Sequence, residues 1–126
     1  MDWERAREAM VEQLQFHYGI EDVALLAAMR AVPRHCFLPE GFVRDDAYGD
    51  HPLPIGFGQT ISQPFIVAYM TRMLQLRGGE RVLEIGSGCG YQSAVLAELG
   101  ATVFGVERIP ALATHAKRVL EDLGYD

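Results

Sequence analysis

The strongest pattern in this chain lies in residues 82–107, which read VLEIGSGCGYQSAVLAELGATVFGVE. An apolar run leads into three glycines at alternate positions, then a stretch typical of a helix, then a second apolar run that ends in Glu107. This order predicts a buried strand over residues 81–85, a crossover helix over 91–99 and a parallel strand over 102–106. Such a βαβ unit is typical of the first half of a nucleotide-cofactor site in an open α/β sheet.

The glycine spacing indicates which kind of cofactor the loop would hold. Gly86, Gly88 and Gly90 run G-x-G-x-G, and the next residue, Tyr91, stands where a dinucleotide fingerprint requires its third glycine. Glycines let the backbone turn tightly and approach a ligand, and the start of the next helix offers free N–H groups. Glu84 adds a carboxylate two residues before the loop, which suits a ligand with an ammonium group better than one with a pyrophosphate.

Glu107 directly follows the second predicted strand. A carboxylate at that position can accept hydrogen bonds from both hydroxyls of a ribose, which would fix a nucleoside. An acid at a strand end is also common as a solvated charge, and a single glycine would suit an ordinary βα turn. The combination of Glu107 with three loop glycines favours the cofactor interpretation.

The composition argues against several classes of protein. A chain of 126 residues with 49% hydrophobic and 22% charged residues is expected to form one globular domain at most. The net charge is −6, the only lysine is Lys117 and the arginines are scattered, which argues against a duplex nucleic acid partner. No apolar run approaches the ~18 residues that a membrane span requires, and residues 1–4 lead into a charged stretch rather than a signal peptide.

Cysteine usage indicates the cellular compartment. The two cysteines, Cys36 and Cys89, lie far apart and show no metal-ligand spacing, so no metal site is predicted. So low a count is typical of a reduced compartment, and a cytoplasmic location is expected.

Helices and one long loop are expected outside the βαβ unit. The helices are predicted over residues 3–16, 22–31, 62–76 and 110–123. Asp2 and Ser62 are the predicted N-caps of the first and third, with Pro64 in the first turn of the third. Residues 33–62 are rich in proline and glycine and are predicted to be irregular. Because a loop of that length is usually functional or disordered, its aromatic residues favour an ordered, functional segment.

The elements divide the chain into two segments. Residues 1–76 hold the N-terminal helices and the long loop, and residues 77–126 hold the first two βα units of an α/β sheet. Two parallel strands leave one face and two edges open, so a stable sheet of this kind needs at least two or three further strands. The sequence therefore predicts one incomplete α/β domain.

Ser62 supports two interpretations. As an N-cap, its hydroxyl would satisfy an orphan N–H group and would need no chemical role. A helix N-terminus preceded by a glycine-containing loop and the hydroxyls of Thr60 and Ser62 is also a site for an anion such as a carboxylate. The spacing alone slightly favours the structural interpretation.

Five segments of the chain form a combination of motifs. They are PRHCFLP at 33–39, AY at 47–48, PLPIG at 52–56, QTISQP at 59–64 and VLEIGSGCG at 82–90. Together they resemble the protein-L-isoaspartate O-methyltransferase family, and the similarity extends over essentially the whole chain. The resemblance implies a Rossmann-like S-adenosylmethionine-dependent methyltransferase fold, present as its first half with an N-terminal helical and loop extension.

The resemblance also implies an activity and a site. Members of the family transfer a methyl group from S-adenosyl-L-methionine to the α-carboxylate of L-isoaspartyl residues in damaged proteins and peptides. The methyl ester then closes to a succinimide, so that part of the damaged population returns to aspartate. Ser62 would be the active-site serine. The residues implied at the cofactor are Gln59, Thr60, Ile61, Ser62, Glu84, Gly86, Ser87, Gly88, Gly90 and Glu107. The residues implied at the substrate are Ile55, Gly56, Thr60 and Ser62.

The chain departs from the family pattern in two ways, and alternatives remain open. Val67 stands where one type of family member has a histidine, so Val67 is left out of the predicted site. Family members also continue through further strands that contact the cofactor and cover part of the substrate.

One alternative function is that of a methyltransferase for another small molecule; a nucleic acid substrate or a dehydrogenase fits less well. Another is an inactive fragment, or a half-domain completed by a C-terminal segment or another chain.

Overall fold

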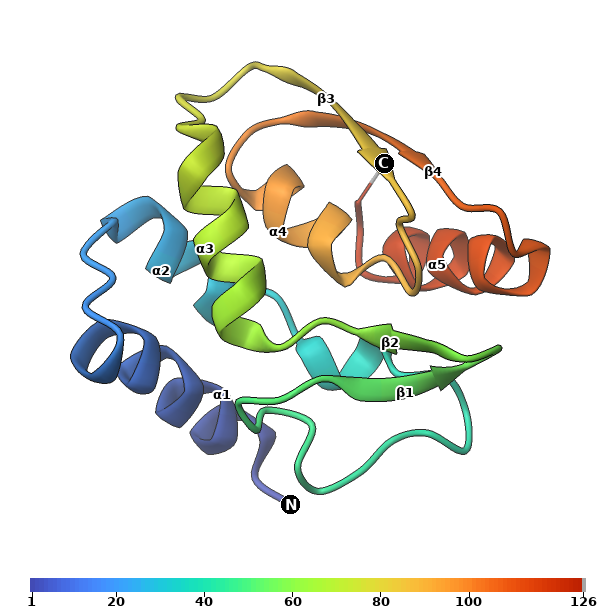
Figure 1. Ribbon diagram of the computed structural model, residues 1–126, viewed down its shortest axis with the longest axis horizontal. Coiled ribbons are helices and arrows are strands. Elements are labelled where there is room, and N and C mark those ends of the chain that lie inside the picture. The colour runs from blue at the N-terminus through green and yellow to red at the C-terminus, as the bar shows by residue number, and fades with distance from the viewer. Residues whose placement is uncertain (126) are drawn as a thin grey trace.

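Two parallel strands, β3 (Arg81–Ile85) and β4 (Thr102–Val106), form the sheet that the sequence predicts, with the predicted bounds. The computed structural model describes residues 1–125. The crossover between the strands is α4 (Tyr91–Glu98), and α5 (Pro110–Asp122) follows β4. Both helices lie on the same side of the sheet, below the strands in Figure 1. The prediction of a βαβ unit followed by a helix is confirmed.

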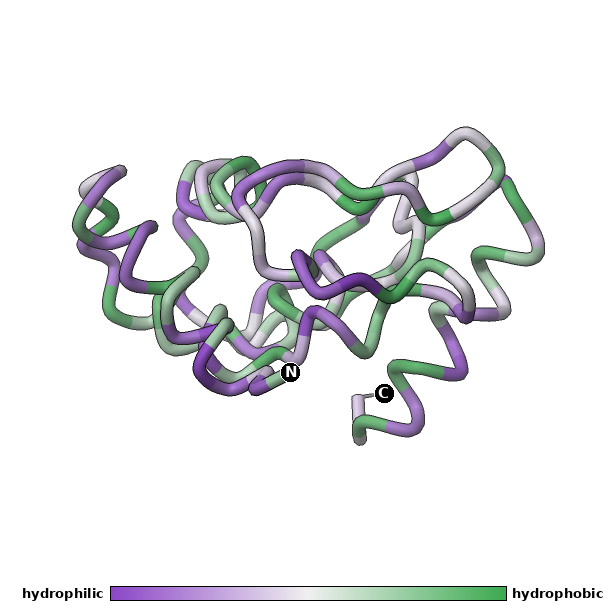
Figure 2. Tube along the Cα trace, turned by 90° about the horizontal axis from the view of Figure 1, so that it is seen from below, coloured by the Kyte–Doolittle hydropathy of each residue, from purple (hydrophilic) through white to green (hydrophobic). Residues whose placement is uncertain are grey.

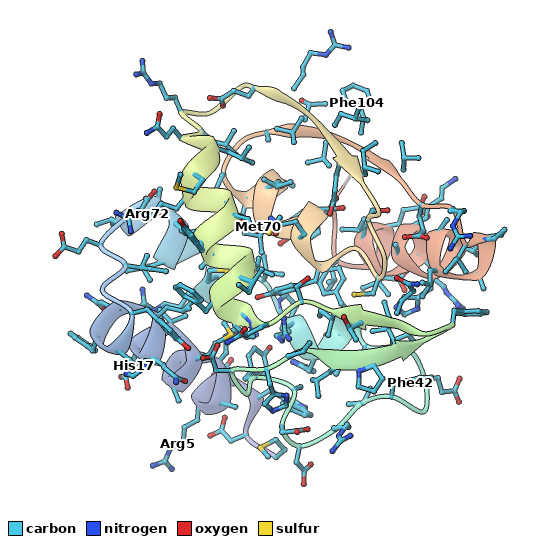
Figure 3. All side chains as sticks on the ribbon, in the orientation of Figure 1. Arg5, His17, Phe42, Met70, Arg72 and Phe104 are labelled. Carbon is cyan, nitrogen blue, oxygen red and sulfur yellow. The ribbon has the colours of Figure 1, made fainter. Side chains whose placement is uncertain are left out.

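The other side of the sheet is open. In the parallel register Leu83 pairs with Phe104 and Ile85 with Val106, so these four side chains form one apolar patch. They are 64%, 47%, 74% and 52% exposed, in the order named. Phe104 projects outward from the strands (Figure 3). The apolar runs resemble strands covered on both faces, but the described residues cover only one face.

The N-terminal part forms the predicted helices, and the predicted cap Asp2 is confirmed. Asp2 accepts a hydrogen bond from the Arg5 amide (3.1 Å) and begins α1 (Trp3–Glu12). The last predicted turn of this helix is a π-helix, Gln13–His17, and the chain then turns at Gly19 with φ +71°. Asp22 caps α2 (Val23–Ala31) in the same way. Figure 2 shows hydrophilic and hydrophobic residues alternating along the helical parts of the trace, as amphipathic helices require.

The long segment predicted as irregular contains regular structure. A short 3-10 helix, η2 (Arg34–Phe37), is followed by an antiparallel hairpin of β1 (Leu53–Gly56) and β2 (Gln59–Ile61). Both residues of its turn have positive φ, +58° at Phe57 and +70° at Gly58, as a type I′ turn requires. The strands are short, and β1 contains Pro54, which is why the sequence pattern did not reveal them.

The helix α3 (Pro64–Leu74) begins later than predicted. Its N-cap is Gln63, and no side chain caps it, so the prediction that Ser62 is the N-cap is wrong. The physical reason is that Pro64 occupies the first helical position, where its missing N–H group is harmless, which makes the preceding residue the cap. Ser62 therefore has no capping role.

One buried cluster holds the chain together. It contains residues of both predicted segments, including Met29, Phe37, Tyr91, Val95 and Leu112. The two segments therefore share a core. Within the described part of the chain, no helix combines the length and hydrophobicity that crossing a bilayer would need.

Gly90 lies against α5 with little space for a side chain. It has φ +95°, and a Cβ atom there would lie 3.1 Å from Ala116 Cβ and 3.4 Å from Leu120 Cδ1. Gly86 has a similar φ of +77° but open space around it. Gly90→Ala is expected to lower the free energy of unfolding by about 1–3 kcal/mol more than Gly86→Ala, because only Gly90→Ala adds a clash between helices. Urea unfolding of both variants measures the difference, and equal losses would contradict the packing described.

Candidate functional site

A small cavity lies between the start of α3 and the loop after β3. Its volume is about 170 Å³. The residues that line it are Thr60, Ile61, Ser62, Val67, Met70, Glu84, Ile85, Gly86, Ser87, Gly88, Cys89, Tyr91 and Gln92. It thus joins two segments that the sequence analysis treated separately, the end of the hairpin and the glycine loop (residues 86–90). Met70 extends from α3, the helix that forms one wall (Figure 3).

The glycine loop has a backbone that other residues would adopt only with strain. Gly86, Gly88 and Gly90 have φ values of +77°, +57° and +95°. The loop is tied to the neighbouring strand, because the amides of Gly86 and Ser87 both donate to the Val106 carbonyl, at 2.7 and 3.1 Å. The turn itself therefore explains the alternate glycines.

Glu107 holds the same loop from the end of β4. Its Oε1 accepts a hydrogen bond from the Gly88 amide (2.8 Å) and its Oε2 one from the Ile109 amide (2.9 Å). The bond from Ile109, and to a smaller extent that from Gly88, keeps the pKa of the Glu107 carboxyl below its ordinary value. Both oxygens retain lone pairs that could accept further hydrogen bonds. Nothing in the sequence pattern indicated this structural role.

Glu107 does not line the small cavity. It lines a second, larger cavity of about 600 Å³ between β4 and α5, which Ser87 and Ser93 also line. Ser87 lines both cavities. A ligand that reached both Ser62 and Glu107 would therefore have to cross the glycine loop at Ser87.

Glu84 lies on the wall of the small cavity. Its side chain points from β3 toward α4 and accepts a hydrogen bond from the buried Ser93 hydroxyl. Burial raises the pKa of the Glu84 carboxyl, and the bond from Ser93 opposes that rise in part. The site therefore carries one half-buried carboxylate that a cationic group could neutralise.

This carboxylate gives a testable dependence of stability on pH. The pKa of Glu84 is higher in the folded than in the unfolded chain. The stability that Glu84 contributes is therefore lost as the pH rises from the unfolded-state pKa through the folded-state pKa. Glu84→Gln keeps a carbonyl that can accept from Ser93. The variant is therefore expected to gain thermal stability relative to the wild type between about pH 4 and about pH 7. Thermal unfolding at several pH values measures this, with Glu12→Gln on the surface of α1 as the control. A constant difference across the pH range would contradict it.

Some of the predicted site residues at the end of the hairpin line the cavity, and one does not. Thr60 and Ser62 line the cavity with exposed side chains, and Ile61 is a buried part of its wall. Gln59 is exposed on β2 and does not line the cavity.

The two remaining substrate predictions fall on the other strand of the hairpin. The prediction that Ile55 contacts substrate stays a prediction. The Ile55 side chain is only 1% exposed and does not line the cavity. It instead supports the loop, since its Cδ1 lies 3.6 Å from where a Cβ of Gly88 would be. Gly56 has φ +91° and lies against the Phe42 ring.

Several cavity residues were missed from the sequence. Val67 was left out, yet it is buried and lines the cavity together with Met70 and Gln92. Gln92 also donates a hydrogen bond from Nε2 to Thr71 Oγ1 (2.8 Å), which joins α4 to α3. The signal that could have found two of them is the helical spacing of Val67 and Met70, which puts both on one face of α3.

A parallel βαβ unit with this glycine loop and an acid at the end of the second strand defines the class of α/β proteins with a nucleoside-cofactor site. Comparison with known protein families is more specific. Residues 5–126 match the family described as protein-L-isoaspartate(D-aspartate) O-methyltransferase (PCMT), and the chain belongs to this family. The resemblance drawn from the motifs is confirmed.

Individual relatives agree with this assignment. The chain is 54% identical over 125 residues to protein-L-isoaspartate O-methyltransferase 1 of Syntrophobacter fumaroxidans, covering 99% of this chain and 58% of the relative. It is 57% identical over 116 residues to the Gloeobacter violaceus protein-L-isoaspartate O-methyltransferase, covering 92% of this chain and 56% of the relative. The chain thus spans a little over half the length of these relatives.

Two solved structures share the fold. One is a protein-L-isoaspartate O-methyltransferase with a TM-score of 0.82 and 31% identity, covering 95% of this chain and 39% of that chain. The other is the Plasmodium falciparum protein-L-isoaspartate O-methyltransferase in complex with S-adenosyl-L-homocysteine, with a TM-score of 0.78 and 24% identity, covering 94% and 56%. The predicted fold class, the first half of a methyltransferase α/β fold with an N-terminal extension, is confirmed.

Proposed function

We propose that this chain takes part in methyl transfer from S-adenosyl-L-methionine to the α-carboxylate of L-isoaspartyl residues in proteins and peptides. The observation that carries the proposal is the small cavity, where the hydroxyl-bearing residues Thr60 and Ser62 lie across from the glycine loop and Glu84. Membership in the isoaspartate methyltransferase family supports the same reaction. The substrate would be a damaged protein or peptide.

The residues present fit the cofactor in charge and shape. The positive-φ glycine loop offers backbone N–H groups and close approach, and Glu84 offers a carboxylate to an ammonium group. Glu107 would hold the ribose, using the lone pairs that its two backbone hydrogen bonds leave free. At about 170 Å³ the cavity is smaller than the ~300–1,000 Å³ of a typical small-molecule pocket, so it would enclose only part of the ligand.

The chain's own contribution to the reaction would be orientation. S-adenosylmethionine supplies an activated methyl group when bound, and a substrate carboxylate is already ionised at neutral pH, so no general base is needed. Ser62 has an exposed hydroxyl at the cavity and no capping role, which leaves it available to donate to one carboxylate oxygen. Holding two reactants in line can supply about 7–11 kcal/mol at best, provided that water is kept out.

The proposal is tested by comparing two peptides that differ only in one linkage. Methyl transfer from labelled S-adenosylmethionine is measured with an isoaspartyl peptide and with its aspartyl twin. We expect methylation of the isoaspartyl peptide alone. Methylation of both peptides would point to another substrate class, and failure of the chain to bind S-adenosylhomocysteine would contradict the proposal at its first step.

We infer that full activity needs further polypeptide over the open face of the sheet. The patch of Leu83, Ile85, Phe104 and Val106 is large and contiguous, and exposed patches of this kind usually mark an interface. This chain matches only 58% and 56% of the length of two relatives. A C-terminal segment like theirs, rather than another chain, is therefore the occupant that fits.

A chimera tests this inference. The 126 residues are followed by the C-terminal part of the S. fumaroxidans relative, and the chimera is compared with the chain alone. We expect the chimera to bind less of an apolar dye and to methylate the isoaspartyl peptide faster. Equal dye binding and equal activity would contradict the inference, and a dimeric mass of the chain alone would favour a second copy as the occupant.

A further inference from the structure

Arg34 is a fully buried arginine without an acidic partner among residues 1–125. Its side chain is 0% exposed, and its Nε donates to the Ala47 carbonyl at 2.7 Å. The two terminal nitrogens of the guanidinium have no hydrogen-bond partner in the described part of the chain. A charge buried in this way is normally paired, so its position needs an explanation.

The guanidinium lies directly behind the wall of the small cavity. Its central carbon is 5.0 Å from the centroid of the Tyr91 ring, which it faces as a cation faces an aromatic ring. Tyr91 is the first residue of α4, and both Tyr91 and Cys89 line the cavity. Arg34 therefore sits beneath the glycine loop without touching the cavity space itself.

The Arg34 guanidinium stays charged, and its charge acts on the cavity wall formed by Tyr91 and Cys89. Burial lowers the pKa of Arg34, yet an arginine remains protonated in proteins. Burial raises the pKa of the Cys89 thiol to about 11 and that of the Tyr91 hydroxyl to about 12, and the positive charge of Arg34 opposes both rises. The field of Arg34 thus favours negative charge around two buried residues that form part of the cavity wall.

The cavity therefore experiences charges of both signs. Glu84 lies on its wall as a carboxylate, and Arg34 lies behind the wall formed by Tyr91 and Cys89. A neutral or purely cationic ligand would make no use of the buried arginine. A ligand whose end carries an ammonium group beside a carboxylate matches both charges.

We propose that Arg34 is a specificity-determining residue whose buried charge favours the carboxylate of the amino-acid end of the S-adenosyl ligand. The inference rests on the proposed function and adds to it a residue that does not line the site. At an effective dielectric constant of about 20, a unit charge about 10 Å from an ion changes affinity roughly tenfold. Removing the charge should therefore act on ligands that carry this carboxylate and spare those that do not.

Two ligands separate this electrostatic role from a structural one. S-adenosylhomocysteine carries the amino-acid end, and 5′-methylthioadenosine has the same nucleoside without it. Their dissociation constants are measured by calorimetry on the wild type, Arg34→Met and Arg34→Lys, and on Arg34→Gln if Arg34→Met does not fold. The ratio of the two constants is used because a reduced folded fraction affects both equally.

In Arg34→Met, the affinity for S-adenosylhomocysteine is expected to fall roughly tenfold relative to the affinity for 5′-methylthioadenosine. In Arg34→Lys, which keeps the charge, this relative loss should be much smaller. Arg30→Met is the matched control, because Arg30 is an exposed arginine paired with Glu8, and it should leave the ratio unchanged. An equal weakening of both ligands in Arg34→Met would overturn the inference and leave a structural role. A wild type that binds neither ligand would instead overturn the proposed function, and this inference with it.

Discussion

Ser62→Ala is expected to lower turnover about 10- to 100-fold while it leaves the affinity for S-adenosylmethionine nearly unchanged, since a hydrogen bond to a charged group is worth roughly 1.5–3 kcal/mol. The Ser62 hydroxyl lines the cavity but does not cap α3. Its removal should therefore take away an interaction with the reacting carboxylate and little of the protein's stability. A loss confined to turnover indicates an interaction made in the transition state.

The measurement is isoaspartyl-peptide methylation by the chimera, with the cofactor dissociation constant determined on the same samples. Ser62→Thr retains a hydroxyl and is the matched control, and it should recover a large part of the turnover. Full activity in Ser62→Ala would refute the orienting role. A loss of cofactor affinity equal to the loss of turnover would assign Ser62 to the cofactor instead.

Glu107→Ala is expected to weaken the binding of S-adenosylhomocysteine about 10- to 100-fold, with each lost charge-assisted hydrogen bond worth roughly 1.5–3 kcal/mol. Two effects act together. The Gly88 amide loses its partner, so the glycine loop is no longer held in place, and the ribose loses the carboxylate proposed to bind it.

Glu80→Ala provides a matched control for the structural part of this effect. Glu80 is also an acid that accepts two backbone N–H groups, from Arg77 at 2.6 Å and Gly78 at 2.7 Å, but at the opposite end of the sheet. Both variants should lose stability, and only Glu107→Ala should lose affinity for the ligand. An unchanged dissociation constant in Glu107→Ala would rule out the cofactor role.

The parts of the fold that could be predicted from the sequence are those with a strong local pattern. Continuous apolar runs and glycines set the bounds of β3 and β4, and Asp2 and Asp22 mark the starts of two helices as caps. The hairpin of β1 and β2 could not be predicted in the same way. It has short strands, and its register depends on the turn at Phe57 and Gly58 rather than on a hydrophobic pattern.

The candidate site was predictable only in part for a related reason. The sequence names residues at the glycine loop and at the end of the hairpin, but it does not give which side chains face the same space. Ile55 illustrates the limit, because the bulge between Pro54 and Gly56 interrupts the register of its strand, and its side chain is buried. Arg34 illustrates the converse, since nothing in its local sequence distinguishes a buried arginine from a solvated one.

The hydrogen bonds that hold the glycine loop have a consequence for the thermodynamics of association. The amides of Gly86 and Ser87 bond to Val106, and that of Gly88 bonds to Glu107, so the chain itself supplies every partner in these bonds. The loop therefore loses its conformational entropy when the chain folds, and not when a nucleoside binds. More of the contact energy then remains as binding affinity, as it does for any rigid receptor.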